Sequence, residues 1–200
     1  MIYMKKFILI LLMTILLSTS LSTSLSADDS VYIYPEFVIQ ETMSNIIQIA
    51  KDGGIPSNDP LLVRAQKLLN DSRKNYRRDL EIIATVVYNE AGYGCSDRHM
   101  ELVAGVIYNR LKSDLFPDTI YEIVTAPKQY HPLYAEEGSI YHELAKSSDK
   151  WEQCLEIAER ALRGDIDCPD TVFFQANFPQ GTSDYEIHDT SYSRTWFCYG

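Results

Sequence analysis

The chain has 200 residues, of which 46% are hydrophobic and 12% aromatic, and a formal net charge of -10 at pH 7. That length suits one domain with appendages, and the composition excludes a disordered chain. The N-terminal segment carries two lysines and no acid, so the rest of the chain has a charge near -12, which excludes nucleic acid as a partner. An acidic chain also gains no attraction to an anionic cell envelope, so such a substrate must be held by shape and hydrogen bonds.

The N-terminal segment has the pattern of a secretory signal peptide. Lys5 and Lys6 precede an apolar run from Phe7 to Leu17, and small residues then lead to a cleavage point near Ala27. The apolar run is short for a bilayer span, so an uncleaved membrane anchor is the alternative. We therefore predict a signal peptide over residues 1–27 and a protein secreted out of the cytoplasm.

Two helices are predicted after the signal peptide. Apolar residues follow helical spacing over residues 37–51, and Gly53-Gly54 ends that pattern. Asn58-Asp59-Pro60 is typical of a helix start, and the second helix continues to Leu69. This part of the chain shows no internal repeat.

A basic stretch then leads toward the next helix. It contains Arg73, Lys74, Arg77 and Arg78. We place a domain boundary near Tyr76, which divides the chain into a helical lead-in, residues 28–76, and a second domain, residues 77–200.

The second domain opens with a carboxylate at the end of an amphipathic helix. The apolar stripe of this helix consists of Leu80, Ile83, Ala84, Val87 and Ala91. Gly92 and Gly94 end the helix directly after Glu90. A carboxyl group beside a buried stripe is partly desolvated, which raises its pKa and suits it to act as a general acid. The alternative is a solvated glutamate that caps a helix end.

Three more helices are predicted before the chain changes character. Ser96-Asp97 caps the first, which extends to Leu111 and contains Gly105, a residue that often marks a close helix contact. Residues 116–119 form a turn and cap for a short helix that ends at Val124. An irregular loop over residues 126–138 follows, and Trp151 to Leu162 is a clear amphipathic helix.

The residue pattern of the C-terminal part predicts β-strands. Residues 171–176 and 195–199 are β-branched and aromatic, and the loop between them contains Pro179, Gly181 and Asp184. We therefore predict an α+β fold, mostly helical, with a small antiparallel sheet near the C-terminus.

The four cysteines predict disulfides in an exported chain. Cys95, Cys154, Cys168 and Cys198 allow three pairings. We favour Cys154 with Cys168, which flank a helix end and a turn, and Cys95 with Cys198.

We expect no metal and no cofactor. The cysteines lack the CxxC spacing of a zinc site, and the histidines lack paired-ligand spacing; they are His99, His131, His142 and His188. No GxSxG elbow indicates a serine nucleophile.

Two kinds of catalysis remain. Cys95 would lie at a helix N-terminus, which lowers a thiol pKa, with His131 or His188 as its base. Glu90 could instead protonate a glycosidic oxygen, either with a second carboxylate or alone, with a sugar hydroxyl attacking internally. The candidate second carboxylates are Asp184, Glu186 and Asp189.

Several segments together resemble the SleB-type cell wall hydrolases, bacterial enzymes of spore-cortex lysis. They are residues 84–91 (ATVVYNEA), 103–110 (VAGVIYNR), 116–120 (FPDTI), 129–130 (QY), 172–176 (VFFQA), Gly181 and 196–199 (WFCY). The resemblance runs in order over roughly residues 79–200. It implies a compact lysozyme-like, transglycosylase-like catalytic domain over residues 77–200 that cleaves peptidoglycan glycan strands and leaves an anhydromuramic end.

The resemblance also implies roles for individual residues. Glu90 occupies the position of the catalytic glutamate in the Tyr-x-Glu-Ala motif, in which Tyr88 is the tyrosine. Substrate-binding positions are then Tyr88, Asn109, Gln129, Tyr130 and Gln175. The alternative for Asn109 is a helix-end cap, and for Gln175 a strand residue facing water.

Two features separate this chain from the family pattern. The turn over residues 92–98 differs from the acidic turn of many members, and the lead-in is not a repetitive wall-binding module. A role in vegetative wall remodelling is therefore as open as one in spore-cortex lysis. We expect a monomer in the cell wall or spore envelope that meets a membrane only through an uncleaved signal segment. The alternative functions are a Cys95-dependent wall peptidase and a non-catalytic envelope or spore structural protein.

Overall fold

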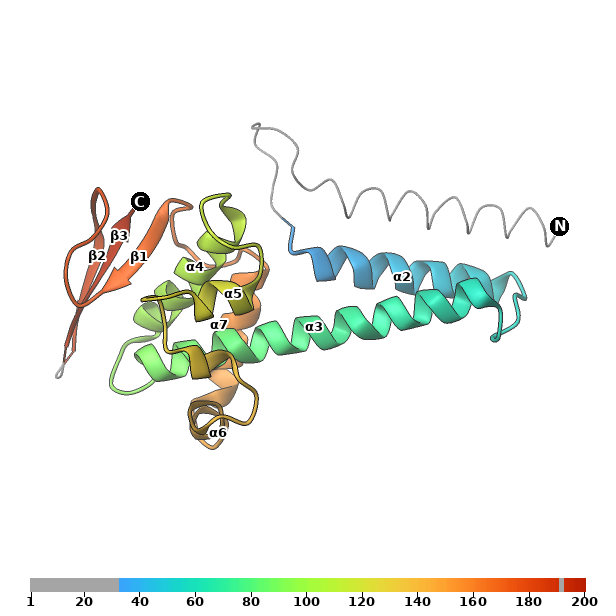
Figure 1. The fold of residues 1–200 in the computed structure, drawn as a ribbon, viewed down its shortest axis with the longest axis horizontal. Helices are drawn as coiled ribbons and strands as arrows, with labels where there is room; N and C mark the ends of the chain where they lie inside the picture. Colours follow the sequence, from blue (N-terminus) through green and yellow to red (C-terminus); the bar gives the residue numbers. More distant parts are fainter. Residues whose placement is uncertain (1–32, 191–192) are drawn as a thin grey trace. The chain divides into compact units, whose positions relative to one another are not determined.

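The computed structural model describes residues 33–190 and 193–200, so the predicted signal peptide lies outside the described residues. In chain order the elements are α2 (Pro35–Asp52), α3 (Pro60–Ala91), α4 (Asp97–Lys112), α5 (Ile120–Thr125), the 3-10 helix η1 (Pro132–Ala135), α6 (Ile140–Lys146), α7 (Trp151–Leu162), β1 (Val172–Ala176), β2 (Ser183–Asp189) and β3 (Arg194–Tyr199) (Figure 1). In the part of the chain that the structure describes, no helix has the length and apolarity to cross a membrane.

The chain divides into two compact units, and the division falls inside α3. The first unit ends at Arg77, and the second runs from Arg78 to Gly200. This division lies next to the predicted boundary at Tyr76. The assignment of residues 28–76 as a lead-in and 77–200 as the catalytic domain stays a prediction.

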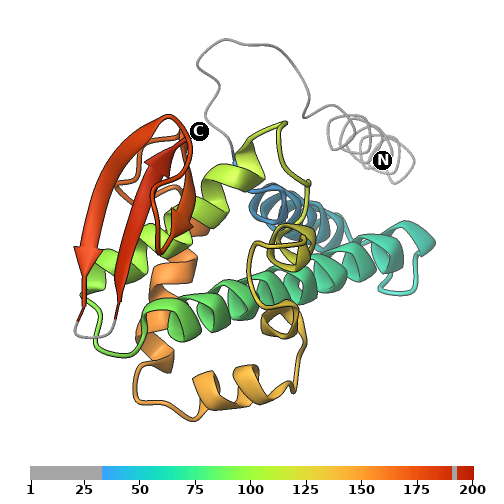
Figure 2. The ribbon, with the colours of Figure 1, turned by 60° about the vertical axis from the view of Figure 1, so that its left-hand side comes forward.

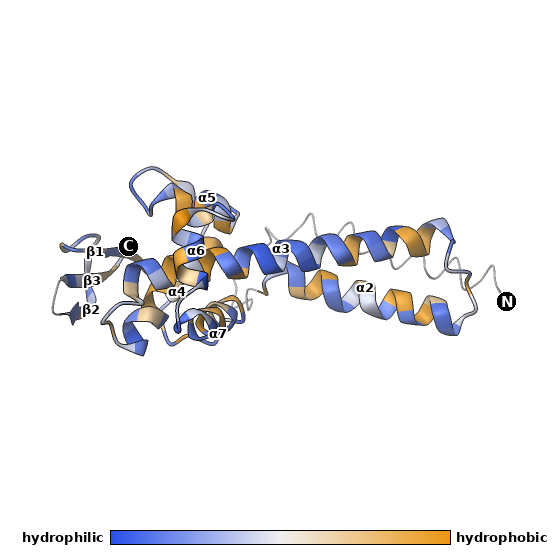
Figure 3. Ribbon diagram, turned by 90° about the horizontal axis from the view of Figure 1, so that it is seen from below, coloured by the Kyte–Doolittle hydropathy of each residue, from blue (hydrophilic) through white to orange (hydrophobic). Residues whose placement is uncertain are grey.

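The first unit is a helical hairpin of α2 and the start of α3. Its buried core consists of Met43, Ile46, Ile47, Ala50, Ile55, Leu62, Ala65 and Leu69. In Figure 3, hydrophobic stretches recur along both helices. The turn between them has the predicted caps, because Gly54 adopts a left-handed φ of 69° and the Asp59 carboxylate accepts the Leu61 N–H at 3.0 Å.

The prediction of separate helices on the two sides of the basic stretch was wrong. The structure has one continuous helix, α3, from Pro60 to Ala91. No glycine and no other proline interrupts this segment, so nothing in the chain ends the helix before Gly92. The residues between Leu69 and Leu80 are polar, but polar residues continue a helix as readily as apolar ones.

The second unit is built around α4. Ser96 caps this helix as predicted, its hydroxyl accepting the His99 N–H at 3.2 Å. Nearly every residue from His99 to Leu111 is buried, because α5, α7 and β1 pack around the helix. Gly105 contacts the side chain of Cys168 in the loop after α7, so the close approach that we expected from another helix comes from a loop.

The C-terminal sheet has three antiparallel strands in the order β1-β3-β2 (Figure 2). The α+β class, mostly helical with a small C-terminal sheet, is confirmed. The predicted loop between the two strands was wrong in part, because residues 183–189 form β2 on the free side of β3. That segment mixes charged and aromatic residues on a half-exposed strand, which weakens the strand pattern in its sequence.

The segment between α5 and α7 is also more ordered than predicted. The loop over residues 126–138 contains η1, and α6 follows it with Ser139 as its N-cap. Both elements are short, seven residues or fewer, so their sequences carry little periodicity. This segment brings several aromatic side chains toward the end of α3.

Candidate active site

Glu90 lies in the last turn of α3, where a glycine controls the path of the chain. The Gly92 N–H donates to the Tyr88 carbonyl oxygen at 2.8 Å. A Cβ on Gly92 would lie 2.6 Å from that oxygen and 2.7 Å from the Tyr88 ring, so only glycine fits. The turn therefore closes tightly behind Glu90.

The Glu90 carboxyl group reaches solvent and is nevertheless crowded by protein. Its side chain is exposed to solvent. Desolvation by the surrounding atoms raises the pKa of Glu90, and a hydrogen bond from Tyr134 opposes that rise. Accessibility combined with a raised pKa is the state expected of a general acid in a cleft.

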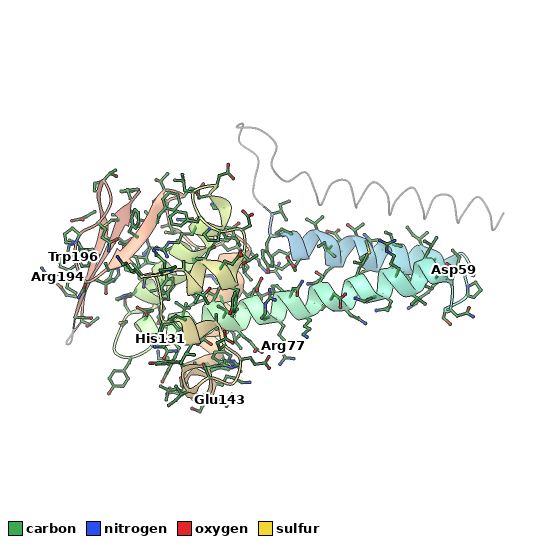
Figure 4. All side chains as sticks on the ribbon, in the orientation of Figure 1. Asp59, Arg77, His131, Glu143, Arg194 and Trp196 are labelled. Carbon is green, nitrogen blue, oxygen red and sulfur yellow. The ribbon has the colours of Figure 1, made fainter. Side chains whose placement is uncertain are left out.

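Tyr134 belongs to η1 and anchors an aromatic cluster. Burial and the nearby Glu90 carboxylate raise the pKa of Tyr134, so its hydroxyl stays protonated and donates to Glu90. The Tyr134 ring centroid lies 5.1 Å from that of Tyr141 and 5.6 Å from that of His131, and the His131 and Tyr141 centroids are 4.6 Å apart. Figure 4 labels His131 in this segment. We call His131, Tyr134 and Tyr141 the aromatic cluster.

Tyr130 links the Glu90 region to the sheet. Its hydroxyl donates to the Gln175 Oε1 atom of β1 at a long 3.4 Å. Burial raises the pKa of Tyr130 to about 12, and the negative charge of Glu90 adds to that rise. The structure therefore brings together three of the predicted site residues, Glu90, Tyr130 and Gln175.

A buried arginine, Arg110, packs against the Tyr130 ring. The Arg110 guanidinium lies 5.6 Å from the Tyr130 ring centroid and 5.4 Å from that of Phe116. Its Nε atom donates to the Phe173 carbonyl oxygen at 2.8 Å, whereas its buried Nη1 atom has no partner. Arg110 thus connects α4, β1 and the loop that carries Tyr130.

Asn109 holds the first strand of the sheet. It is 2% exposed, and its Nδ2 atom donates to the Pro169 and Val172 carbonyl oxygens at 2.8 and 3.0 Å. This geometry differs from both sequence interpretations, because the amide neither faces a cleft nor caps its own helix. It holds the start of β1 against α4.

The contacts of the other two predicted binding residues, Gln129 and Tyr88, do not indicate a role. Gln129 is exposed beside Tyr130, and its backbone N–H donates to the Ala126 carbonyl oxygen at 3.2 Å. Tyr88 is half-buried against Gly92. Their role in substrate binding stays a prediction.

The candidate second carboxylates have other partners. Arg98 and His188 bind Glu186, and Arg98 is the main reason that the pKa of Glu186 is lowered. Arg194 pairs with Asp189 on the exposed end of the sheet, where Figure 4 labels Arg194. Asp184 accepts from the Cys198 thiol at 3.5 Å. Each of the three carboxylates is therefore held by a neighbouring side chain.

The cysteines do not form the predicted bridges. All four are free thiols, and Cys154 and Cys198 are buried on α7 and β3. Cys168 accepts from the Asn109 amide at 3.5 Å, and the Cys95 thiol faces the Tyr93 carbonyl oxygen at 3.9 Å. The four sulfur atoms thus have separate surroundings.

Cys95 also lacks the electrostatics of a nucleophile. Burial raises its pKa, the opposite of the lowering expected from a helix N-terminus. His188, one of its two candidate bases, is bound to Glu186 and faces His99 across 5.1 Å between ring centroids. Within residues 33–190 and 193–200, no cluster of three potential ligands could hold a metal ion.

Sequence reasoning missed Tyr134, Tyr141 and Arg110 as parts of this region. The available signal was the density of aromatic residues after Gln129, where Tyr130, His131, Tyr134 and Tyr141 follow within a short stretch. No spacing rule says that such a stretch folds back on the end of α3.

Comparison with known proteins places this region in a family. A family model described as Cell Wall Hydrolase matches residues 94–195. The matched part includes Asn109, Tyr130 and Gln175 and begins just after Glu90. No curated protein and no solved structure matches the chain significantly.

Proposed function

The chain belongs to the cell wall hydrolase family, whose role is peptidoglycan degradation, and we propose that it cleaves the glycan strand with Glu90 as general acid and base. The observation that carries the proposal is the solvent-accessible Glu90 carboxyl group, whose pKa desolvation raises, hydrogen-bonded to Tyr134. A raised pKa keeps a fraction of the carboxyl group protonated when the substrate arrives.

The proposed reaction is that of a lytic transglycosylase acting on the MurNAc–GlcNAc bond. Glu90 gives its proton to the glycosidic oxygen as the bond from that oxygen to the MurNAc C1 atom breaks. The resulting carboxylate then takes the proton of the MurNAc C6 hydroxyl as that oxygen bonds to C1. The products are an anhydromuramic end and a free GlcNAc end, and Glu90 regains its proton.

Two features support a mechanism with one carboxylate. Tyr134 donates to Glu90 and stabilises the carboxylate formed after the first proton transfer. The acids Glu186 and Asp189 are held in ion pairs with arginines, so neither is poised as a base for water. An internal hydroxyl nucleophile needs no second carboxylate.

The proposed substrate contacts come from β1 and from the segment that contains η1. Gln175, which the buried Tyr130 holds through its hydroxyl, offers an amide group to sugar hydroxyls, and the aromatic cluster offers apolar ring faces. Tyr88 and Gln129 complete the proposed binding residues. Export through the N-terminal segment would deliver this site to the cell wall or the spore envelope.

A glycan digest tests the proposal. Purified peptidoglycan is treated with the mature chain, with Glu90→Gln, and with Glu143→Gln, a matched change at an exposed glutamate of α6 that Figure 4 labels. Mass spectrometry should find anhydromuramic ends with the first and third proteins and at least about a hundredfold fewer with Glu90→Gln, the lower end of the range for loss of a general acid. Undiminished cleavage by Glu90→Gln would reject the proposal.

The same digest separates the alternatives. A Cys95-dependent peptidase would release free peptide amines and lose activity on alkylation, although the raised pKa of Cys95 disfavours it. A structural protein would bind the wall and release nothing. Parallel digests of spore cortex and vegetative wall show which substrate is preferred.

A further inference from the structure

A small pocket lies beside Tyr134, within the second unit of the chain. Its lining comes from α3, from η1 and the two residues after it, and from α6; among the lining residues are Glu81, Thr85, Tyr134, Glu136, Glu137 and His142. The pocket has a volume of about 30 Å³, which is room for about two water-sized groups.

This pocket is close to the Glu90 carboxyl group. Tyr134 lines the pocket, and its hydroxyl donates to Glu90. Thr85 of the pocket wall precedes Glu90 by five residues, which is about 7.5 Å along the axis of α3. A group carried on a sugar beside the cleaved bond is therefore within reach of the pocket.

A buried hydrogen-bond donor faces the pocket. His142 is 3% exposed, and its Nδ1 atom accepts the Gly138 N–H at 2.9 Å. Nδ1 therefore carries no hydrogen, so the ring hydrogen of the neutral imidazole is on Nε2. Nε2 has no hydrogen-bond partner among the described residues, because the Glu81 Oε2 atom lies 3.6 Å away, beyond hydrogen-bonding distance. A buried donor in this state favours an acceptor atom in the pocket.

The exposed part of the pocket lining is mainly acidic. Glu136 and Glu137 are exposed, and within the described part of the chain neither carboxylate forms an ion pair; Glu136 accepts the Tyr121 hydroxyl at 2.9 Å. Arg78 also lines the pocket, but its guanidinium donates twice to Asp79, at 3.0 and 3.1 Å.

The charge of the whole second unit has the same sign. Residues 78–200 contain ten basic and 21 acidic residues, a net charge of -11. Such a unit is attracted only to the cationic groups of a cell wall. Across residues 33–190 and 193–200, no three potential ligands converge on a metal ion, so the cation that suits this pocket is an organic one.

We propose that the pocket binds a primary ammonium group of the wall together with an oxygen atom on a neighbouring carbon. This inference rests on the proposed function and deepens it, because the ammonium group belongs to the substrate of Glu90. An ammonium group donates three hydrogen bonds and accepts none, which suits the carboxylates of Glu136 and Glu137. The neighbouring oxygen atom accepts from His142 Nε2. Two adjacent small groups also match the room in the pocket.

Two components of a peptidoglycan wall carry this pair of groups. A glucosamine unit without its N-acetyl group has an amine at C2 and a hydroxyl at C3. A free amino acid centre in a stem peptide has an amine beside a carbonyl or carboxylate carbon. Acetylation removes the charge of either amine and adds an acetyl group that exceeds the pocket volume. The pocket should therefore discriminate between free and acetylated amines.

The test measures the binding of glycan strands to the mature chain carrying Glu90→Gln, the parent protein, which under the proposed function leaves the strands intact. Glu136→Gln/Glu137→Gln in this background removes two exposed charges from the pocket. Glu152→Gln/Glu156→Gln removes two exposed charges from α7, outside the pocket, and is the matched control.

A second pocket variant tests the buried donor. His142→Asn keeps an acceptor for the Gly138 N–H and lacks the Nε2 donor. Because Glu136 and Glu137 are exposed, their double variant keeps the test valid even where a change at the buried histidine impairs folding.

Three strand preparations distinguish the two sources of the amine. The first is free of peptides and fully N-acetylated. The second is free of peptides and partly de-N-acetylated, and the third is fully N-acetylated and carries peptides with free amines. Each amine-bearing preparation is also measured after chemical acetylation.

The parent protein and the matched control should bind one or both amine-bearing preparations about fivefold more tightly than the first preparation, the top of the usual range for an exposed ion pair. Chemical acetylation should remove this preference, and about 300 mM salt should reduce it. Both pocket variants should bind all preparations alike. The preparation that is preferred identifies the amino sugar or the peptide as the source.

Three results would overturn the proposal. Equal binding of free and acetylated amines by the parent protein would show that the pocket holds water only. A preference that either pocket variant keeps would place the amine elsewhere. A preference that the matched control also loses would show that only total charge matters. Cleavage of the first preparation by the chain with Glu90 intact is measured separately, so a failure to cleave concerns the proposed function and leaves the binding result unchanged.

Discussion

The Tyr134 hydroxyl donates a hydrogen bond to the Glu90 carboxylate, joining η1 to the last turn of α3. Burial raises the pKa of both groups, and the hydrogen bond partly reverses the rise at Glu90. Tyr134 is therefore placed to tune the acid proposed for catalysis. It reaches Glu90 through a loop whose sequence gives no sign of that contact.

Tyr134→Phe should raise the pKa of Glu90 further, because it removes a donor that stabilises the carboxylate. A hydrogen bond to a charged group contributes about 1.5–3 kcal/mol, so the shift should be about one to two pKa units. Since Glu90 must be protonated to act as an acid, the alkaline limb of kcat/KM should move up by about that amount. The measurement is a pH profile of glycan cleavage. Tyr121→Phe, which removes an exposed hydroxyl bonded to Glu136, should leave the profile unchanged, and a downward shift in Tyr134→Phe would contradict the prediction.

Asn109→Ala should lower stability and leave KM unchanged. The buried Asn109 amide donates to the Pro169 and Val172 carbonyl oxygens, and its removal deletes both hydrogen bonds at a cost of about 2 kcal/mol. Urea unfolding measures the loss, and kinetics on the folded fraction measure KM. Asn70→Ala, an exposed change on α3, is the control. A large rise in KM without loss of stability would return Asn109 to the substrate-binding residues.

The sequence predicts those parts of the fold that depend on contacts between residues close together in the chain. Ser96 and Thr119 cap helices because their hydroxyls accept a nearby backbone N–H, and both were predicted. Gly54 ends α2 by adopting a left-handed φ. The continuity of α3 differs from the two helices predicted there, because the polar stretch between Leu69 and Leu80 contains no helix-breaking residue.

The parts that sequence could not predict depend on distant contacts. Glu90 is recognisable at its helix end, but its partner Tyr134 arrives through η1, a short element with no periodicity. Asn109 and Arg110 are adjacent in the chain, yet one holds β1 and the other lies under Tyr130. Only the packing of α4 against the sheet and the Tyr130 loop separates their roles.

Arg110→Lys should weaken substrate binding and stability together. Lysine keeps the charge but loses the flat guanidinium that lies over Phe116 and Tyr130 and the Nε donor to Phe173. We expect a loss of about 2 kcal/mol in the free energy of unfolding. Because Tyr130 would lose its support, KM should rise more than kcat falls. Arg163→Lys, an exposed pair with Glu159, should change neither quantity, and an unchanged KM in Arg110→Lys would show that Tyr130 does not need the arginine.

Stability should fall as the pH drops from about 6.5 to about 4, because of His99. Burial and the facing His188 lower the pKa of His99 from 6.5 to about 4. The unfolded chain therefore takes up a proton near pH 6.5 that the folded protein refuses until about pH 4. The free energy of unfolding is therefore unaffected by His99 above pH 6.5. It falls by about 3 kcal/mol as the pH drops from 6.5 to about 4. The other groups around His99 are His188, which is bound to Glu186, and Arg98, which is also bound to Glu186.

His99→Phe isolates this contribution. His99 is 2% exposed, its Nδ1 atom has no partner, and its ring meets Phe197 edge-on at 5.4 Å, so a phenyl ring replaces it at little cost in hydrogen bonds. Urea unfolding of both proteins is measured between pH 4 and 7.5. The difference in unfolding free energy should grow in favour of the variant as the pH falls, since the variant has no proton to exclude. A difference that stays constant with pH would show that His99 takes up its proton in the folded protein as readily as in the unfolded chain.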